Sequence, residues 1–487
     1  MKMNFGKIAS PIASRLLVIA GFVFFSIAFV CAFVHSLTVF DSFSSASGAF
    51  LAAVIALLAV SALAMNRRVG KKAFIIIVPG VALALRLIWA LLVDTPPSSD
   101  FLFMHNAALA AAKGDFSFAS SDYYTSWAYQ LGFTMYEALI VKLFGTPIIF
   151  LKVINVLWST GTVALVYWTA GKAFNEFCGR AAAIAYAFYI PNIVMCSVLT
   201  NQHVSMFFFM LGCALLVHRG LTGKYSWLLI GLSFAIGHIM RPIGGVYIAA
   251  LLVFVTVFRA FPWSLKRSGP LLAKTAGIVV VFYLLQATVS QSFIQTGVTA
   301  YPLANREPYW KFVVGLNTES GGVWNAADGK HMRQFKLGEE RNREERRVVI
   351  ERLSNVDALP SLFARKFVSF WGGPDSSAFW SMEKLNMPKQ TERVNKLERA
   401  VYAAMCFFGA IGLLALVRDR QYEWHRLFLI LLFGYAAIHL FIEIQGRYRL
   451  DMIPILVLLQ SYGVYAAYSR ITLWLSPRAD RDQGVPM

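Results

Sequence analysis

Apolar runs long enough to cross a lipid bilayer recur along this chain, and they restrict its fold more than any other feature. The first three occupy residues 16–38, 48–64 and 73–93. A helix needs about 20 such residues to span the hydrocarbon core. Hydrophobic residues make up 57% of the chain, and the mean hydropathy is +0.58, which excludes an ordinary soluble domain. The sequence therefore predicts an all-α polytopic membrane protein.

The distribution of basic residues predicts how these helices are oriented. The formal net charge is +19, but most of the excess lies in short loops between apolar runs, as expected of cytoplasmic loops, and does not indicate nucleic-acid binding. Lys2, Lys7 and Arg15 precede the first run, which lacks a convincing signal-peptide cleavage site and is expected to remain as an anchor. If residues 129–144 lie at the outer interface or re-enter the membrane instead of crossing it, every short basic loop becomes cytoplasmic. We therefore expect both termini in the cytoplasm.

The same map predicts the organisation of the chain into roughly twelve spans. The further runs lie at residues 147–171, 179–197, 201–218, 226–240, 242–258, 275–292, 398–418, 424–442 and 450–470. The expected parts are two extra N-terminal transmembrane helices (1–72), a transmembrane core (73–292) with a first outer loop (94–146), an extracytoplasmic loop domain (293–397), C-terminal transmembrane helices (398–470) and a cytoplasmic tail (471–487).

The most informative polar stretch follows the third apolar run. Asp94 and Asp100 emerge there, and residues 101–113 carry apolar side chains at helical spacing before Gly114. This pattern predicts a helix lying on the membrane surface. An acid held at the interface can serve as a general base on a lipid-linked substrate. The alternative is that Asp100 only caps the helix, and the two roles are compatible.

Other polar residues are expected at the same face as Asp100. They are Gln202 and His203, Arg241 beside Pro242, and the run Arg447-Tyr448-Arg449. The three arginines in these outer-face connections are exceptions to the tendency of basic residues to lie on the cytoplasmic side. Guanidinium groups match phosphate oxygens in pairs, so arginines near a carboxylate are suited to glycosyl transfer from a membrane-embedded sugar phosphate. The alternative is that the Arg-Tyr-Arg run anchors a helix end at lipid phosphates.

The sequence has three further notable features: a charged residue inside an apolar run, a cluster of aromatic residues, and five scattered cysteines. Arg86 lies inside the third run, where a charge is costly, and is expected to face the protein interior near the outer acids; the alternative is a snorkelling side chain. The aromatic residues expected at the membrane interface, or alternatively at a sugar site, are Phe367, Phe370, Trp371, Phe379 and Trp380. Five cysteines lack CxxC spacing, so no disulfide or zinc site is expected. A divalent metal is compatible with the chemistry but is not indicated.

Ordered motifs then point to a family. They are Ser99-Asp100, Tyr129-Gln130-Leu131-Gly132, Lys142-Leu143-Phe144-Gly145, Lys152-Val153-Ile154-Asn155, Arg241-Pro242, Gly315-Leu316-Asn317, and Arg447-Tyr448-Arg449 with Pro454. With them the chain resembles, over roughly residues 80–465, a GT-C-type integral-membrane glycosyltransferase of the group of protein O-mannosyltransferases and bacterial aminoarabinose transferases. The chain departs from this group at Gln130, often proline there, and at Gln202, often acidic.

The resemblance implies a GT-C-like bundle and a role for three candidate residues. Asp100 corresponds to the acid of the first outer loop and is the expected catalytic residue, and Arg447 and Arg449 correspond to donor-phosphate contacts. Tyr448 and Arg241 are further candidates for binding the donor phosphate. The candidates for contact with the acceptor, or for support of the residues that make it, are Asp94, Gln202, His203 and Glu443. A second catalytic carboxylate is not placed, since Glu443 has a structural role at a helix end as its alternative.

The function expected from the sequence is a glycosyltransferase of the cell membrane. It would move a sugar from a polyprenyl-phosphate donor to an acceptor on the outer face: a surface polysaccharide, a lipid-linked glycan or a protein. Its partners would be the donor, the glycan or protein acceptor and membrane lipids, with no nucleic acid. The alternatives are a polysaccharide ligase or polymerase, and a flippase or transporter of lipid-linked sugars.

Overall fold

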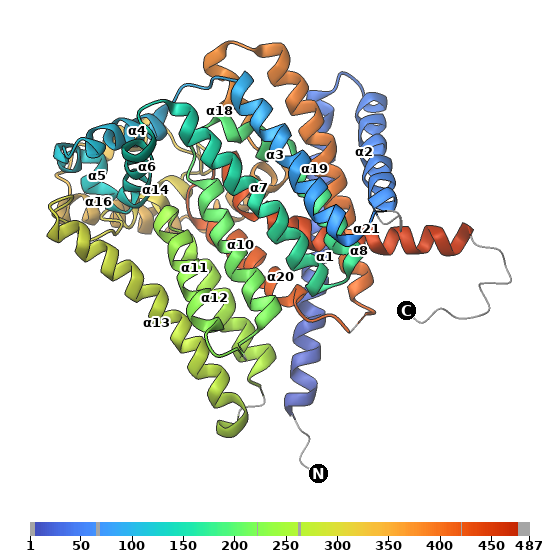
Figure 1. Ribbon diagram of the computed structural model, residues 1–487. Coiled ribbons are helices and arrows are strands. Elements are labelled where there is room, and N and C mark those ends of the chain that lie inside the picture. Colours follow the sequence, from blue (N-terminus) through green and yellow to red (C-terminus); the bar gives the residue numbers. More distant parts are fainter. Residues whose placement is uncertain (1–4, 65–68, 222, 262–263, 420, 476–487) are drawn as a thin grey trace.

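The computed structural model describes residues 5–64, 69–221, 223–261, 264–419 and 421–475 (Figure 1). Lys2 and residues 476–487 of the expected tail therefore lie outside the described residues. Regular structure in the described ranges is helical, and one isolated bridge pairs Trp127 with Asn305. The all-α polytopic class predicted from the apolar runs is thus confirmed.

The long helices correspond to the most apolar runs. They are α1 (Phe5–Val39), α2 (Phe43–Ala64), α3 (Lys71–Leu92), α7 (Ile148–Ala173), α13 (Leu265–Gln295), α19 (Pro388–Leu416) and α21 (Ile453–Leu475). Within the described residues, seven helices are long and apolar enough to cross a membrane, and an eighth span results if a pair bent by 53° is counted as one. That pair joins α8 (Glu176–Ala187) to α9 (Ile190–Val194) and η3 (Met195–Ser197).

The expected number of roughly twelve is reached only with four shorter helices. These are α10 (Gln202–Arg219), α11 (Ser226–Met240), α12 (Gly244–Phe254), which continues into the π-helical turn η4 (Val255–Arg259), and α20 (His425–Phe441). α11, α12 with η4, and α20 are apolar but shorter than 18 residues. A full crossing by each of them, and the orientation of the bundle, stay predictions.

The centre of the bundle is α19, which packs against α1 on one side and α21 on the other. Gly412 of α19 faces Gly463 of α21, and a side chain on Gly463 would collide with the backbone oxygen of Phe408. Small residues at such a crossing let two helix backbones approach closely. The N-terminal helix α1 is therefore part of the central core through α19.

One end of the bundle carries the helices that do not match spans (Figure 1). They are α4 (Ser99–Ala112), η1 (Ser117–Ser120), α5 (Asp122–Ser126), η2 (Ala128–Gln130), α6 (Leu131–Phe144), α14 (Trp310–Gly315), α15 (Ala326–Met332), α16 (Glu339–Ser354), α17 (Leu359–Phe367), η5 (Val368–Gly372), α18 (Ser377–Met382), η6 (Glu383–Leu385) and η7 (Gly446–Met452). The helix predicted over residues 101–113 is α4, and it packs against α6. With 14 residues, α6 is too short to be among the candidate spans. Its interfacial placement remains a prediction.

The segment predicted to be a loop domain, residues 293–397, contains a small separate core and is held against the bundle. Trp310, Val313 and Val314 of α14 contribute to this core. The buried ammonium of Lys366 donates to the backbone oxygens of Gly315 at 2.7 Å, Leu440 at 2.8 Å and Ile442 at 2.8 Å. Because these carbonyls belong to the ends of α14 and α20, Lys366 holds the domain at the end of α20.

Arg86 faces the protein interior as predicted, but its hydrogen-bond partners do not include Asp94 or Asp100. Arg86 is fully buried and donates to Ser159 Oγ at 2.8 Å and to the backbone oxygens of Ala187 at 2.9 Å and Tyr186 at 3.1 Å. These carbonyls lie at the end of α8, where the bend before α9 interrupts the regular helical hydrogen bonds. Arg86 therefore supplies hydrogen bonds to carbonyl oxygens where the α8–α9 span is bent. Because its side chain is buried, the snorkelling alternative is wrong.

The aromatic cluster expected at the membrane interface is divided by the fold. Phe370 and Trp371 are buried in η5, and Trp371 packs edge-on against Phe24 of α1 at 5.0 Å between ring centroids. Phe379 is 48% exposed, while Trp380 faces Arg447. The interface assignment is wrong for Phe370 and Trp371, because Phe370 stacks on Tyr435 and His439 of α20 and Trp371 packs against α1.

Candidate functional site

The helix η7 distributes the polar residues of the Arg-Tyr-Arg run in different directions. A 3₁₀-helix has three residues per turn, so residues three apart eclipse each other and residues two apart do not. Tyr448 and Asp451 therefore share one side, which faces Arg241. Arg447 and Arg449 point to different surroundings.

Asp451 is the buried anion at the centre of this arrangement. It has no exposed surface and accepts from Arg241 Nη2 at 2.8 Å, Gln202 Nε2 at 2.9 Å and Tyr435 Oη at 3.0 Å. Burial alone would lower the pKa of Arg241, but the Asp451 carboxylate raises it overall. Buried charges need such pairing, so this network fixes the loops at Gln202 and Arg241 against η7. The sequence analysis missed Asp451, although its position at the start of an apolar run was a signal.

Arg447 lies between aromatic rings at the end of the bundle. Its guanidinium carbon is 4.3 Å from the ring centroid of Trp380 and 4.8 Å from that of Phe101. Its Nε donates to Gln445 Oε1 at 2.9 Å, and the terminal nitrogens have no partner among the described residues. Burial lowers the pKa of Arg447. Two donors in one plane are thus held ready for an anion.

Arg449 does not join Arg447. It is completely buried, with Nη2 3.0 Å from Glu398 Oε1 and Nη1 2.7 Å from the backbone oxygen of Gly373. Its guanidinium also lies 3.8 Å from the ring centroid of Tyr402. The expectation that both arginines of the run face the donor is wrong for Arg449, because the 3₁₀ turn directs it into the bundle.

The start of α4 brings Asp100 within electrostatic influence of this cation, since the next residue, Phe101, contacts Arg447. The N-cap residue is Ser98, no side chain caps the helix, and Asp100 lies in the first turn. The half-buried carboxylate has no hydrogen bond or ion pair among the described residues. The nearby Tyr123 hydroxyl is buried and has no hydrogen-bond partner among the described residues. Its pKa is raised mainly by burial and to a smaller extent by the charge of Asp100. The capping alternative is therefore wrong, and a carboxylate remains free for another role.

The backbone just before Asp100 is strained. Ser99 has a φ of +50°, in the left-handed region that residues with a side chain rarely adopt. Such outliers persist where the surrounding structure enforces them, and they cluster at functional sites. The preceding segment is fixed, since Thr95 Oγ1 donates to the backbone oxygen of Ser381 at 2.7 Å. The loop thus sets the direction of the Asp100 side chain.

Glu443 supports Arg447 and is not free to act as a base. It is buried, forms an ion pair with Lys311, and accepts from Gln445 Nε2 at 2.9 Å. Burial alone would raise the pKa of Glu443, but Lys311 lowers it overall. A chain of contacts then runs from Lys311 through Glu443 and Gln445 to the Nε of Arg447. Lys311 is a second member of the site that the sequence analysis missed.

Asp94 has a structural partner. Its side chain is 96% exposed, and its Oδ1 lies 2.9 Å from the ammonium of Lys152, which is 1% exposed. A buried lysine on α7 is thereby paired at the beginning of the loop that follows α3. Asp94 fixes this loop to α7, and the structure does not bring it into contact with Arg447.

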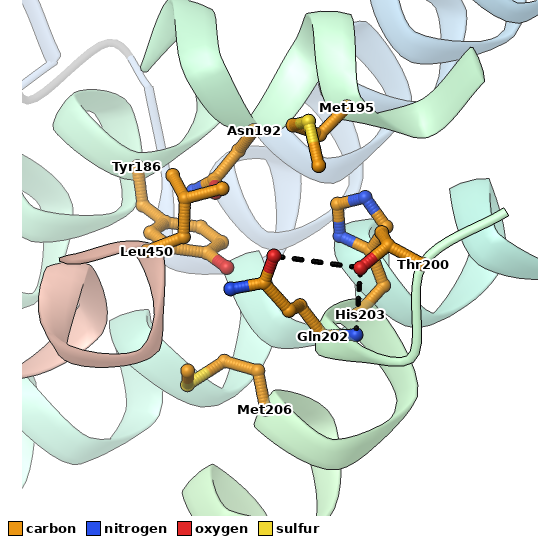
Figure 2. A pocket seen from close by; sticks show the side chains of 8 residues that line it. All are labelled: Tyr186, Asn192, Met195, Thr200, Gln202, His203, Met206 and Leu450. Atoms are coloured by element: carbon orange, nitrogen blue, oxygen red, sulfur yellow. Dashed lines mark hydrogen bonds between the residues drawn. The ribbon is translucent and has the colours of Figure 1, made fainter. Parts of the chain in front are cut away.

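Gln202 and His203 line a small buried cavity behind η7 (Figure 2). Thr200 Oγ1 donates to Gln202 Oε1 at 3.4 Å, while Gln202 Nε2 reaches Asp451. His203 Nε2 and Asn192 Nδ2 have no partner among the described residues. The volume of about 10 Å³ suits one water molecule. Gln202 is therefore a positioning residue for Asp451, and His203 does not reach Asp100.

Residues 133–285 match a family model described as dolichyl-phosphate-mannose-protein mannosyltransferase. The match supports a membrane glycosyltransferase of the GT-C type. The resemblance seen in the sequence motifs is thus confirmed over this part of the chain. A comparison with curated proteins finds no match.

The region matched to the glycosyltransferase family contains only part of the site. It runs from α6 into α13 and includes Gln202, His203 and Arg241. Asp100, Lys311 and η7 lie outside it. Their roles in the glycosyltransferase rest on the geometry of this chain alone. No group of three or more His, Cys, Asp or Glu side chains that could hold a metal occurs in the described ranges.

Proposed function

We propose that this glycosyltransferase moves a sugar from a polyprenyl-phosphate donor to an acceptor hydroxyl at the outer face of the cell membrane. One observation carries the proposal: Arg447 is held between aromatic rings with two free donor nitrogens, and the unpaired carboxylate of Asp100 lies beside it. Such a transfer needs an anion-binding group for the phosphate and a base for the acceptor hydroxyl close to each other.

Arg447 would bind the donor phosphate, with Tyr448 and Arg241 next to it. The guanidinium of Arg241 lies 5.0 Å from the ring centroid of Tyr448, and that of Arg447 lies 5.7 Å from it. A planar guanidinium can donate to two phosphate oxygens at once. Because Arg241 is already paired with Asp451, its main part is to add positive potential. Arg447 supplies the direct bonds.

Asp100 would act as the general base. Its carboxylate takes the proton of the acceptor hydroxyl while that oxygen forms a bond to the anomeric carbon of the sugar. The bond from the anomeric carbon to the phosphate oxygen breaks, and the phosphate keeps the electron pair. Arg447 stabilises the charge that develops on this leaving group. The step needs no second carboxylate, consistent with Glu443 being committed to Lys311.

The test is to reconstitute the purified protein in liposomes with polyprenyl-phosphate sugars and to measure released polyprenyl phosphate. The proposal expects release that depends on an added acceptor. Transbilayer movement of the donor lipid with no release, by the unmodified protein, would instead indicate a flippase and would overturn the proposal.

A further inference from the structure

A second cavity lies on the other side of α18 from Arg447. It is an open groove of about 620 Å³ between the end of α1, the segment from α18 through η6, and the beginning of α19. Its size is within the range of small-molecule binding sites, roughly 300–1,000 Å³. The wall contributed by Thr38 and Val39 belongs to α1, outside the part of the chain that matches the family model.

The chemistry of the groove selects one class of ligand. Its polar lining residues are Thr38, Glu383, Asn386, Thr391, Glu392 and Asn395. The amides and hydroxyls both donate and accept hydrogen bonds, and the carboxylates accept them. No lysine or arginine is among the described residues that line it, so a phosphate or another anion would be disfavoured. The other lining residues are apolar: Val39, Phe379, Met382, Met387 and Pro388. A ligand for this mixed surface needs apolar faces together with hydrogen-bonding groups, and a lipid chain alone would leave the polar groups unsatisfied.

The groove is also lined by an exposed aromatic ring. Phe379 lines the groove with 48% of its surface exposed, beside the amides. The apolar face of a sugar ring can pack on such a ring while its hydroxyls bond to the neighbouring amides and carboxylates. An aromatic platform with short hydrogen-bonding side chains is suited to a neutral, hydroxyl-rich chain.

We propose that this groove binds the neutral glycan portion of the acceptor. The inference rests on the proposed function, since it assigns the acceptor class of the same site. α18 separates the two places: Phe379 faces the groove, whereas the next residue, Trp380, contacts Arg447 and Phe101. A helix is about 10–12 Å across with its side chains. A glycan seated in the groove can therefore extend around α18 and present its end to Asp100.

Two substitutions remove groove amides without disturbing the backbone. Asn386 has a φ of +52°, which glycine adopts without strain, so Asn386→Gly removes the amide alone. Asn395 lies within α19, where alanine is the better helix former, so Asn395→Ala removes the second. Lys389→Ala, an exposed change on the same helix that does not line the groove, is the matched control.

The experiment measures binding to the full-length protein in nanodiscs by calorimetry. The probes are maltohexaose, a neutral mannohexaose, an anionic hyaluronan hexasaccharide and a serine-rich dodecapeptide. The proposal expects at least one neutral hexasaccharide to bind, with Kd raised about tenfold or more in the double variant and unchanged in Lys389→Ala. Binding of neither neutral probe, equal binding by the double variant, or binding of the anionic probe or the peptide that the double variant abolishes would overturn it.

Release of polyprenyl phosphate is measured on the same proteins. No contact of Asn386 or Asn395 with Arg447 or Asp100 occurs among the described residues, so release at a saturating acceptor concentration should be equal in the wild type and the double variant. If the wild type releases no polyprenyl phosphate with any acceptor, the proposed function fails, while the binding data still decide whether the groove takes a neutral glycan.

Discussion

The guanidinium of Arg447 lies 4.3 Å from the ring centroid of Trp380, and Trp380 packs edge-on against Phe101 at 5.5 Å. Three segments far apart in the sequence thus meet around one cation: η7, α18 and the beginning of α4. Cation–π contacts hold the guanidinium plane without using its terminal nitrogens. The arrangement orients Arg447 before any substrate arrives, and Phe101 links this orientation directly to Asp100.

The different surroundings of Arg447 and Arg449 predict different effects of the same substitution. Arg447→Lys loses the planar fork that would bind phosphate, so the KM for the donor should rise about tenfold or more with little change in thermal stability. Arg449→Lys breaks a buried, paired group, so it should lower stability. Donor titrations and thermal unfolding of both purified variants check this. An unchanged donor KM in Arg447→Lys would leave Arg447 as a structural residue.

Removal of the charge at Asp451 should loosen the loops around the site. Asp451→Asn leaves Arg241 buried without its anion, and breaking a buried pair costs about 3–5 kcal/mol. We expect a clearly lower unfolding temperature in detergent and weaker donor binding. Asp357→Asn, an exposed change in the loop domain, serves as control. Equal stability of the two variants would show that the Asp451 network does not hold η7.

The loop domain should carry a pH-sensitive carboxylate at Glu345 of α16. Glu345 has no exposed surface, and neither of its oxygens has a partner in the described part of the chain. Burial, with a smaller contribution from Glu307, raises the pKa of Glu345 to about 8. Because the folded state binds this proton more tightly than the unfolded state, its stabilisation is complete below about pH 4.5 and is lost as the pH rises through about 8.

Glu345→Gln should remove this dependence. The wild type should lose stability between pH 5 and pH 8, on the order of a few kcal/mol, while the variant should be nearly flat over this range. Glu351→Gln, on the exposed face of α16, should behave like the wild type. Unfolding temperatures measured at several pH values decide the matter, and parallel curves for wild type and Glu345→Gln would contradict the prediction.

The orientation of the bundle follows from the short basic loops and can be measured by thiol labelling. The five native cysteines form no disulfide in the structure, so they can be replaced. Single cysteines at Lys172, Lys224 or Lys266 should be shielded from a membrane-impermeant reagent in intact cells, while Ser120→Cys and Glu340→Cys should react. Labelling at Lys172 and Lys224 but not at Lys266 would mean that α6 crosses the membrane.

The sequence predicted the helices better than the directions of their side chains. Each predicted apolar run overlaps a helix, although α1, α13 and α19 begin about ten residues before the predicted runs, and Gly114 marked the end of α4. Arg449 was misplaced because Arg447-Tyr448-Arg449 was expected to be a connection before a span at residue 450, whereas Gly446–Met452 is a 3₁₀-helix that directs the two arginines apart. Trp371 was misplaced because burial under α1 is a long-range contact that local pattern does not encode.

The site could be predicted only where a residue type was unusual for its place. Asp100, Arg241 and Arg447 were noticed because charges at the ends of apolar runs are costly. Lys311 gave no such signal, since a lysine is ordinary in a loop. Trp380 was noticed only as a member of an aromatic cluster, and its contact with Arg447 was not predicted. The part of Lys311 in the site follows from its contact with Glu443, 132 residues further along the chain, and that of Trp380 from its contacts with Arg447 and Phe101.

The most direct test of the proposed mechanism is transfer by Asp100→Asn. The N-cap of α4 is Ser98 and no side chain depends on Asp100 for a hydrogen bond, so the variant should express, remain stable in detergent and bind the donor. Without a base, release of polyprenyl phosphate to an acceptor should fall by roughly 10²-fold or more. Asp122→Asn, the same change at an exposed site in α5, should retain activity. Near-normal transfer by Asp100→Asn would contradict the assignment of Asp100 as the base.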